Sequence, residues 1–365
     1  MKTVKVLKFR YKASSELVLL FEDFRLMVND AIRIALRYEE RAGERVRSRF
    51  ALISLAYPRL KEYGLHTKYI LSACEVAYSA YKNRNRKTGP YARRAFLKLD
   101  NQAYRLDYLL LRIPTAALTF IHLTLSGSNY HLSFLADENL KRCSVTITPS
   151  HVVIAFSREV EAVERVGNVG VDVNERNVTW SDSAGRTRKE DTSEVAEIKA
   201  RYREARAKIA KRTQNDRRTQ RTLLAKYGRR ERDRTVQVLH RASKRLVEHA
   251  ASNRFGIVME RLRGIRKLYR KGNGQGRNYR GRMNSWMFCE FQKQVEYKAA
   301  WLGVPVIYVN PSGTSRRCPE CGSRLVGVEG RLLRCPWCNK TGDRDVIASK
   351  NIMMACVVPQ VRPST

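Results

Sequence analysis

Three acidic residues lie in short apolar stretches that are far apart in the sequence. Asp172 stands in Asn-Val-Gly-Val-Asp-Val-Asn, Glu260 in Gly-Ile-Val-Met-Glu-Arg-Leu, and Asp345 in Gly-Asp-Arg-Asp-Val-Ile-Ala-Ser. Burying a carboxylate costs free energy unless a cation lies beside it. Carboxylates held a few ångströms apart repel one another, and two divalent metal ions remove this repulsion. Such ions activate a water molecule and stabilise the leaving oxygen of a phosphodiester, so the three acids predict a nuclease-type metal site.

A chance arrangement is the alternative for any one of these acids. The chain has 35 Asp and Glu residues, so some of them follow an apolar run without a catalytic role. Histidine offers no competing site, because none of the six histidines clusters with a second candidate ligand. The prediction therefore depends on the three acids taken together.

Two aspartates are candidates for the third acid of this metal site. Asp343 lies where a helix N-cap is expected, and an acid at that position is usually structural. Asp345 is two residues further on and shares a helical stripe with Ala348, Ile352 and Cys356. The pattern therefore favours Asp345 as the metal ligand and Asp343 as the cap.

Four clustered cysteines predict a second, different metal site. Cys318, Cys321, Cys335 and Cys338 form a C-x2-C-x13-C-x2-C pattern, and Glu329-Gly330 between the pairs indicates a hairpin turn. Each pair can place two thiolates on one tetrahedral zinc ion. Because protein fills all four positions, one structural Zn²⁺ ion in a zinc ribbon is expected. Two unrelated redox pairs are the alternative.

The other four cysteines are scattered among apolar neighbours. They are Cys74, Cys143, Cys289 and Cys356. The simplest interpretation is that all four are small buried hydrophobic residues. No disulfide framework or disulfide-linked partner is predicted, which favours a reducing cytoplasm.

The charge of the chain predicts an anionic partner. The 365 residues, enough for two or three domains, include 71 Lys and Arg against 35 Asp and Glu, a formal net charge of +36. A membrane surface is the alternative, but the most apolar stretch, 109–125, is broken by Arg112, Pro114 and His122. The first residues alternate polar and apolar side chains and show no signal-peptide core. Nucleic acid is therefore the expected partner.

Cationic residues concentrate in one predicted helical region. Residues 199–245 contain roughly four times as many cations as anions, so salt bridges within the helices cannot neutralise them. A solvated helix face is the alternative to contact with phosphates, and phosphate contact would make binding strongly salt-dependent. The predicted nucleic-acid-binding residues are Lys199, Arg201, Arg203, Arg217, Arg218, Arg229, Arg230, Arg316 and Arg317.

The first half of the chain changes from one periodicity to another. Residues 3–11 read as a strand, and the pattern from about Ser15 to Leu109 is helical. Residues from about Ala116 to Ser157 alternate with a period of two. We therefore expect a small antiparallel barrel or sheet that includes the opening strand, with the helical block inserted into it.

The second half alternates strands and helices, which suits an α/β core. Val169, Val171 and Val173 alternate with Asp172, so the acid projects from one face of a strand. The expected elements that come next are a strand near 178–180, helix over 194–250, a strand over 255–259, a segment without periodicity over 266–282, a helix over 284–302, a strand over 304–309, and a closing helix after the cysteines.

Several of these motifs together resemble the TnpB family. They are Gly170-Val-Asp-Val-Asn-Glu, Val258-Met-Glu-Arg-Leu-Arg-Gly-Ile, Thr314-Ser-Arg-Arg-Cys-Pro-Glu-Cys-Gly and Asp343-Arg-Asp-Val-Ile-Ala-Ser-Lys-Asn-Ile. The family comprises transposon-encoded RNA-guided DNA endonucleases related to the type V CRISPR effectors. The resemblance runs clearly from about Gly167 to Ile352. Leu65-His-Thr-Lys-Tyr-Ile-Leu-Ser-Ala is similar to archaeal members.

The resemblance implies a multidomain α+β fold. It implies a wedge-like β-barrel over 1–13 and 114–165, and a helical recognition domain inserted at 14–113. A RuvC-like nuclease domain with an RNase H-like α/β fold is expected over 166–312 and 343–365. The zinc ribbon, a target nucleic-acid-binding insertion, is expected over 313–342.

The resemblance also implies a function. Asp172, Glu260 and Asp345 would be catalytic and hold two Mg²⁺ ions, for which Mn²⁺ can substitute. The partners would be a guide RNA from the transposon end and double-stranded target DNA. The expected location is the cytoplasm of a prokaryote, in association with the nucleoid and archaeal in type. The family usually has Asn and Ala where this chain has Ile347 and Ser349, but the three acids are present, so cleavage is predicted.

Three alternatives stay open at the level of sequence. The first is an RNA-guided DNA-binding protein or repressor with weak or no cleavage. The second is a transposition accessory protein. The third is a transposase that joins DNA strands without RNA, and no tyrosine or serine recombinase pattern supports it.

Overall fold

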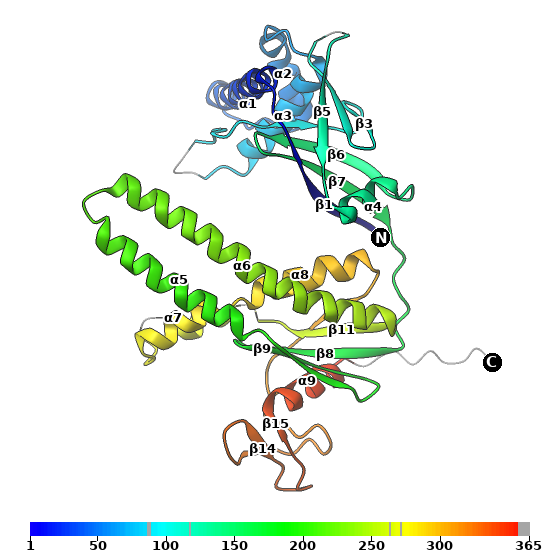
Figure 1. Ribbon diagram of the computed structural model, residues 1–365, viewed down its shortest axis with the longest axis vertical. Coiled ribbons are helices and arrows are strands. Elements are labelled where there is room, and N and C mark those ends of the chain that lie inside the picture. Colours follow the sequence, from blue (N-terminus) through cyan, green and yellow to red (C-terminus); the bar gives the residue numbers. More distant parts are fainter. Residues whose placement is uncertain (86–88, 117, 263, 271, 357–365) are drawn as a thin grey trace, which may run out of the picture. The chain divides into compact units, whose positions relative to one another are not determined.

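The computed structural model describes residues 1–85, 89–116, 118–262, 264–270 and 272–356 (Figure 1). It divides into two compact units, Lys2–Glu159 and Val160–Thr365, of which the second also takes in Met1. No helix in the described part of the chain is long and apolar enough to cross a membrane. The two units are described one at a time.

The unit Lys2–Glu159 is built on a seven-stranded antiparallel sheet with the order β2-β6-β7-β1-β5-β4-β3. β1 pairs with β7 from Lys2 to Phe9 and with β5 at Arg10 and Tyr11, so the expected pairing of the opening strand is confirmed. No pairing between described residues joins the edge strands β2 and β3, so the sheet is open there. The strands are β1 Lys2–Tyr11, β2 Leu97–Leu99, β3 Arg105–Asp107, β4 Leu110–Pro114, β5 Phe120–Ser126, β6 Lys141–Thr148 and β7 His151–Glu159, and a short helix, α4, spans Asn129–Ala136.

Three helices lie in the chain between β1 and β2. They are α1 Ser15–Ala42, α2 Arg49–Lys61 and α3 Thr67–Lys82. α1 begins after Ser14, whose side chain accepts a hydrogen bond from the Leu17 backbone N–H, and it ends at Gly43, where φ is 69°. The helical block is therefore present, as the periodicity indicated.

The expected extent of this block was wrong at its C-terminal end. Helix ends at Lys82 rather than near Leu109, and β2 and β3 follow. Leu97 and Leu99 are fully buried and alternate with Lys98, and the three residues pair with β6. A stretch of three residues is too short to reveal a period of two against a helical background.

The unit that begins at Val160 is built on a five-stranded mixed sheet with the order β10-β9-β8-β11-β12. β8, β11 and β12 pair in parallel, whereas β9 pairs antiparallel with both of its neighbours, β8 and β10. The expected strands around Asp172, at 178–180, before Glu260 and at 304–309 are all present. The bounds are β8 Gly167–Val173, β9 Asn177–Asp182, β10 Thr187–Asp191, β11 Phe255–Glu260 and β12 Val306–Val309.

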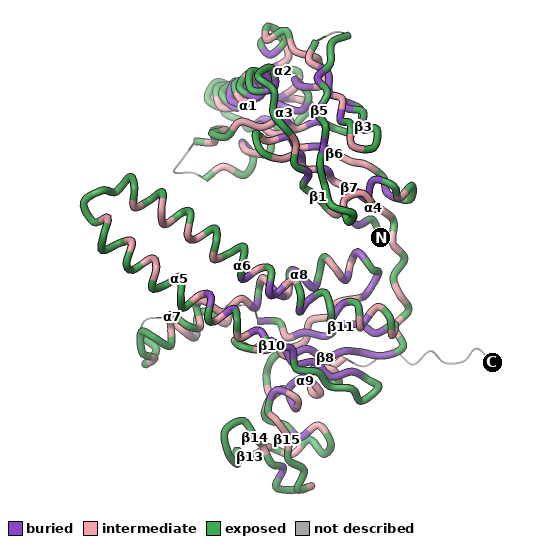
Figure 2. The backbone as a smooth tube through the Cα atoms, viewed as in Figure 1, coloured by how far each residue is buried: buried purple, intermediate pink, exposed green. Residues whose placement is uncertain are grey.

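One face of this sheet carries the main hydrophobic core. Val169, Val171 and Val173 of β8 pack with buried residues of α5, α6 and α8. Figure 2 shows the buried residues gathered along β8 and the inner parts of these helices, while the far ends of α5 and α6 are exposed. The helices are α5 Ser193–Arg212, α6 Arg217–Ser252 and α8 Phe288–Trp301. The segment expected to lack periodicity contains the 3₁₀ helix η1, Ile265–Tyr269, and the start of α7, Arg277–Ser285.

The closing helix α9, Arg344–Met354, packs against β8 and β9 on the opposite face (Figure 1). Gly170 permits this packing, because a Cβ atom there would lie 2.1 Å from the Ser349 carbonyl oxygen and 2.3 Å from the Met353 nitrogen. Asp343 caps the helix as expected, since its side chain accepts hydrogen bonds from the Asp345 and Val346 backbone N–H groups. The strand and the helix thus approach backbone to backbone.

The predicted hairpin in the cysteine segment is also present. β13 Val326–Gly327, β14 Leu332–Arg334 and β15 Thr341–Asp343 form a small antiparallel sheet, with Gly330 in the turn at a φ of 56°. β15 ends at the residue before α9 begins. This small sheet with its four cysteines is called the ribbon below.

The scattered cysteines were not all predicted correctly. Cys74 is fully buried in α3, as expected, but Cys289 is exposed on α8, and Cys143 and Cys356 are partly exposed. For Cys289 the reason is that a helix turns successive residues to different faces, so apolar neighbours in sequence do not imply burial.

Candidate metal centres

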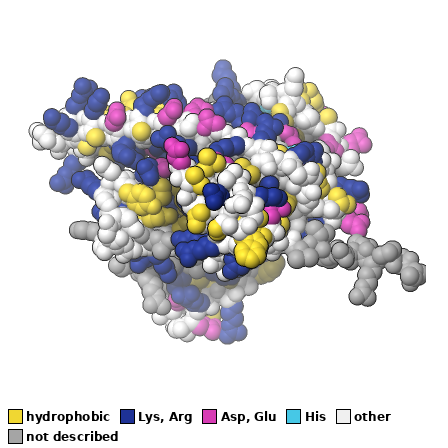
Figure 3. Space-filling view, turned by 90° about the horizontal axis from the view of Figure 1, so that it is seen from below, with side chains coloured by type: hydrophobic (Ala, Val, Ile, Leu, Met, Phe, Trp, Pro, Cys, Tyr) yellow, Lys and Arg dark blue, Asp and Glu magenta, His cyan; other side chains and the backbone are white. Residues whose placement is uncertain are grey.

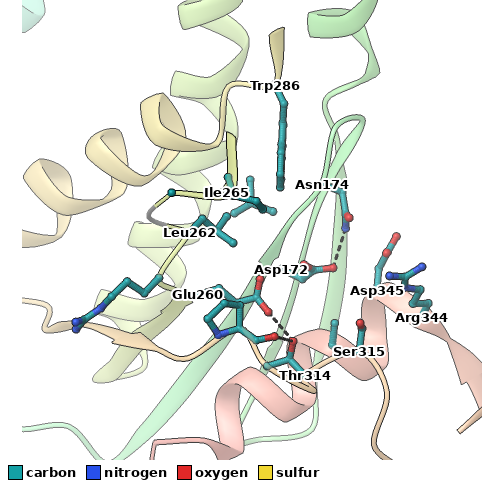
Figure 4. Close-up of a pocket in the computed structure, with 15 residues that line it drawn as sticks. Asp172, Asn174, Glu260, Leu262, Ile265, Trp286, Thr314, Ser315, Arg344 and Asp345 are labelled. Atoms are coloured by element: carbon teal, nitrogen blue, oxygen red, sulfur yellow. Dashed lines mark hydrogen bonds between the residues drawn. The ribbon is translucent and has the colours of Figure 1, made fainter. Parts of the chain in front are cut away.

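The three acids reach one cavity from three elements that are distant in sequence. β8 and β11 are parallel neighbours, so their C-terminal ends meet at one edge of the sheet. Asp172 is the second-last residue of β8, and Glu260 is the last residue of β11. Asp345, in the first turn of α9, completes the set. All three line a cavity of about 510 Å³, together with Thr314 and Trp286 (Figure 4).

Two of the acids, Asp172 and Glu260, form no salt bridge in the described part of the chain. The pKa of Asp172 is raised to about 7, chiefly by burial and also by the neighbouring charges of Glu260 and Asp345, against a hydrogen bond from Asn174 that lowers it. Burial also raises the pKa of Glu260, against a hydrogen bond from Thr314. Both carboxyl groups therefore hold a proton more tightly than they would in water.

Neutral side chains orient these two acids. Asn174 Nδ2 donates a hydrogen bond of 2.8 Å to Asp172 Oδ2, and the Thr314 hydroxyl donates one of 2.6 Å to Glu260 Oε1. Figure 4 shows both bonds on the cavity wall. Asn351 of α9 in turn donates a hydrogen bond of 2.7 Å to the Thr314 backbone oxygen. Helix α9, which carries Asp345, therefore also holds Thr314 in place, and Thr314 orients Glu260.

Asp345 has a different environment. Its side chain is 1% exposed, and both of its oxygens contact cations. Arg331 of the ribbon bonds to Oδ1, and Lys189 of β10 lies 3.2 Å from Oδ2. Asn177 also donates a hydrogen bond of 3.4 Å to Oδ2. The third acid is therefore neutralised by the protein itself.

This set of donors suits a hard divalent cation. It supplies carboxylate and amide oxygens without sulfur or imidazole, which is the ligand chemistry of Mg²⁺ and Mn²⁺. The raised pKa of Asp172 has the same meaning, because a buried carboxylate that lacks a counter-ion holds its proton more tightly. A divalent ion at this position would supply the missing charge.

The four cysteines form a closed site. Their sulfur atoms all lie within 4.8 Å of one another. Cys318 Sγ and Cys338 Sγ are 3.6 Å apart, and Cys321 Sγ and Cys335 Sγ are 3.4 Å apart. Four Zn–S bonds of about 2.3 Å in a tetrahedron require sulfur atoms roughly 3.8 Å apart. The cluster fits zinc in a site with no open position, which is the structural type.

The predicted nucleic-acid-binding cations lie on three segments. Arg201 and Arg203 are exposed on α5, Arg217, Arg218, Arg229 and Arg230 are exposed on α6, and Arg316 and Arg317 are exposed just before Cys318. None of these eight forms an ion pair with another described residue. Seen from below, Lys and Arg side chains are spread over the surface rather than confined to one patch (Figure 3).

Lys199 departs from this pattern. Its ammonium group lies 3.5 Å from a Glu231 carboxylate oxygen, and its side chain is only 15% exposed. Burial lowers the pKa of this lysine. Lys199 thus links α5 to α6 in this structure, which argues against the predicted contact with phosphate.

Sequence reasoning missed the residues that surround the acids. Asn174 stands two residues after Asp172, so its proximity was open to prediction from strand periodicity. Lys189 and Arg331 carried no such signal, because each comes from a separate strand or turn. Thr314 lies in the loop before the cysteines, where only the tertiary fold brings it to Glu260.

Fold and centres together define a multidomain protein of mixed α and β structure with an open carboxylate site and a closed four-cysteine site. The family model described as "Cas12f1-like, TNB domain" matches residues 288–352. The "TnpB-like protein MJ0751" of Methanocaldococcus jannaschii is 36% identical over 250 residues, which are 66% of this chain and 89% of that protein. The chain therefore belongs to the TnpB family.

Two further relatives extend the comparison. The "CRISPR-associated endodeoxyribonuclease Cas12f1" of Sulfoacidibacillus thermotolerans is 30% identical over 116 residues, which are 31% of this chain and 25% of that protein. The solved structure titled "Cryo-EM structure of the Cas12f1-sgRNA-target DNA complex" matches with a TM-score of 0.61 and 13% identity. That match covers 96% of this chain and 99% of the other. At this identity the structural match establishes a shared fold.

Proposed function

We propose that this chain is an RNA-guided, divalent-metal-dependent DNA endonuclease of a transposable element. The observation that carries the proposal is the convergence of Asp172, Glu260 and Asp345 on one cavity from β8, β11 and α9. The relatives support it, because one is a TnpB-like protein and another is an endodeoxyribonuclease by name. A structure with the same fold contains a guide RNA and target DNA.

The three acids would hold two Mg²⁺ ions, or Mn²⁺ in their place. When bound, these ions would activate a water molecule and stabilise the leaving oxygen of the scissile phosphodiester. Asn174 would keep the Asp172 carboxylate turned toward the cavity, and Thr314 would do the same for Glu260. The four cysteines would hold one structural zinc ion, and the folded ribbon would support α9 from its N-terminal end.

The architecture supports the domain assignments made from sequence. A mixed five-stranded sheet with acids at the ends of two central parallel strands suits the RuvC-like, RNase H-like domain proposed over 166–312 and 343–365, whose last nine residues lie outside the described part of the chain. The ribbon suits the insertion proposed over 313–342. The antiparallel sheet supports a wedge-like domain over 1–13 and 114–165, but no pairing between described residues closes it into a barrel. The helices α1, α2 and α3 support the helical recognition domain proposed over 14–113, although β2, β3 and most of β4 in that range belong to the sheet.

Guide RNA and double-stranded target DNA are the proposed partners. The net charge of +36 supports polyanion binding. The proposed phosphate contacts are the eight exposed arginines of α5, α6 and the segment before Cys318, which form no ion pair with another described residue. We further propose that the protein acts in the cytoplasm of an archaeal-type host, beside the nucleoid.

The two departures from the family pattern are accommodated in the packing of α9. Ser349 is fully buried, and its hydroxyl lies 2.7 Å from the Ser181 hydroxyl of β9, so neither group lacks a partner. Ile347 is buried and packs over Gly342 of β15. Since neither residue removes an acid from the cavity, we favour cleavage over RNA-guided binding alone.

Cleavage by the complex with its copurified RNA tests the proposal. Asp172→Asn removes one ligand charge, and we expect plasmid cleavage in Mg²⁺ to fall by about 10³-fold or more while guide and target binding persist. Asp233→Asn, an equal charge change at an exposed site on α6, is the control and should cleave normally. Cleavage by Asp172→Asn at the wild-type rate would exclude the proposed site. Absence of cleavage by the wild-type complex with a discrete RNA would favour the binding-only alternative.

A further inference from the structure

The three proposed metal ligands differ in the groups that their carboxylate oxygens contact. Asp172 and Glu260 each accept one hydrogen bond from a neutral side chain. Asp345 contacts a guanidinium on one oxygen and an ammonium on the other, and its side chain is 1% exposed. A divalent ion that binds Asp345 therefore meets two positive charges that the other two acids do not present.

Arg331 is held at this position by the ribbon. It follows Gly330 in the hairpin turn, and the Arg344 backbone N–H donates a hydrogen bond of 2.9 Å to the Arg331 carbonyl oxygen. The pairing of β14 with β15 begins at the next residue, where Leu332 faces Asp343. The ribbon thus fixes the backbone of Arg331 beside the start of α9, and the side chain reaches Asp345.

The guanidinium is nevertheless accessible to solvent. The Arg331 side chain is 52% exposed, whereas the Asp345 side chain is 1% exposed. Water can therefore solvate the arginine when it swings outward.

We propose that Arg331 is a tethered counter-cation that a metal ion has to displace from Asp345, so that the placement of the ribbon sets the metal affinity of the carboxylate site. This inference rests on the proposed function, since it concerns the ions of the same site. Arg331 is a positioning residue, because it acts through Asp345. A ribbon drawn away from α9 would raise the affinity for the divalent ion, and a ribbon held against α9 lowers it.

Binding of Mn²⁺ to the full chain without RNA or DNA, followed by electron paramagnetic resonance, tests the inference. The ions of the site are those that Asp172→Asn fails to bind. Arg331→Gln removes the competing charge, and we expect these ions to bind about tenfold more tightly. Arg334→Gln is the matched control, because it removes the same charge from the same small sheet at a residue without an ion pair to another described residue. It should leave the affinity within about twofold of wild type.

Two results would overturn the inference. One is the absence of a gain in Arg331→Gln: unchanged Mn²⁺ binding would mean that the arginine does not compete with the ion, and weaker binding would mean that it supports the bound state. The other is an equal gain in Mn²⁺ affinity in Arg334→Gln, which would mean that the effect comes only from the change in net charge. If no bound Mn²⁺ responds to Asp172→Asn, the metal site of the proposed function is itself excluded, and the inference falls with it. The outcomes are thus distinguishable without any measurement of cleavage.

Discussion

The cysteine cluster and the acid cluster are two proposed metal sites built in opposite ways. The cysteines come from one segment of the chain, and their sulfur atoms already lie at distances suited to one ion. The acids come from two strands and a helix, and they line a cavity of about 510 Å³. One site is complete within itself, and the other has space beside its ligands.

The difference lies in how each site handles charge. In the cysteine cluster one Zn²⁺ ion would offset two of the four thiolate charges, and the folding of such a cluster depends on that ion. In the carboxylate site, Arg331 and Lys189 neutralise Asp345, while Asp172 retains a proton up to about pH 7. A site that binds and releases ions during a reaction benefits from protein cations or protons that offset its charge when no ion is bound. A structural site does not need them.

Removing a ligand from the closed site should have the largest effect on structure. Cys335 is fully buried in the cluster, and we expect Cys335→Ser to lose bound zinc and to unfold the ribbon. Hydrogen exchange should increase by several orders of magnitude over 316–342 while β8 and β11 stay protected. The control is Cys289→Ser, at an exposed thiol outside the cluster. If the ribbon stays protected from hydrogen exchange without zinc, its folding does not depend on the ion, and the contrast between the two clusters would be lost.

Gly170→Ala addresses the packing that brings the acids together. The added Cβ would lie 2.1 Å from the Ser349 carbonyl oxygen, so α9 has to move, and with it Asp345. We expect a loss of about 3 kcal/mol in the free energy of unfolding together with weaker cleavage. Gly228→Ala in α6 meets no atom within 4 Å and should stabilise by about 0.5–1 kcal/mol. Urea denaturation measures the free energy of unfolding of both variants. If the two substitutions change it equally, β8 and α9 do not approach closely at Gly170.

The last prediction concerns the dependence of stability on pH. The pKa of Asp172 rises from 3.8 to about 7 on folding, so its contribution to stability is present in full below pH 3.8 and is lost as the pH rises through 7. Asp172→Asn does not titrate. Without added Mg²⁺ we expect it to exceed wild type in stability by an amount that grows between pH 5 and pH 8, on the order of 2–4 kcal/mol.

Urea denaturation of both proteins at pH 5 and pH 8, with zinc retained, measures this difference. Saturating Mg²⁺ should reduce it, because the ion then supplies the missing charge. A difference that is constant across the two pH values would mean that Asp172 is not short of a counter-ion, and the contrast between the sites would weaken.

Local patterns were sufficient to predict much of the carboxylate site. Strand alternation placed Asp172 on one face of β8, and the spacing before α9 separated the cap Asp343 from Asp345. The cysteine pairs needed only their own spacing. These features depend on interactions between residues close in sequence, which periodicity and capping rules describe.

Features that depend on tertiary contacts were missed. Lys189 and Arg331 approach Asp345 from a strand and a turn with no shared motif, and Lys199 finds Glu231 on another helix. The strand at Leu97–Leu99 was taken as helix because its alternation is too short to register. In each case the decisive partner lies more than 10 residues away, where a sequence pattern carries no information about distance.

The direct passage from β15 into α9 has a geometric consequence. β15 ends at Asp343 and α9 begins at Arg344, so no linker absorbs a change in chain length. Each residue added to a helix turns the adjoining chain by about 100° and advances it by about 1.5 Å. A single insertion at this junction would therefore rotate the whole ribbon about the axis of α9. Length variation between related chains is then expected inside the ribbon, between its cysteine pairs, where a longer hairpin leaves the junction unrotated.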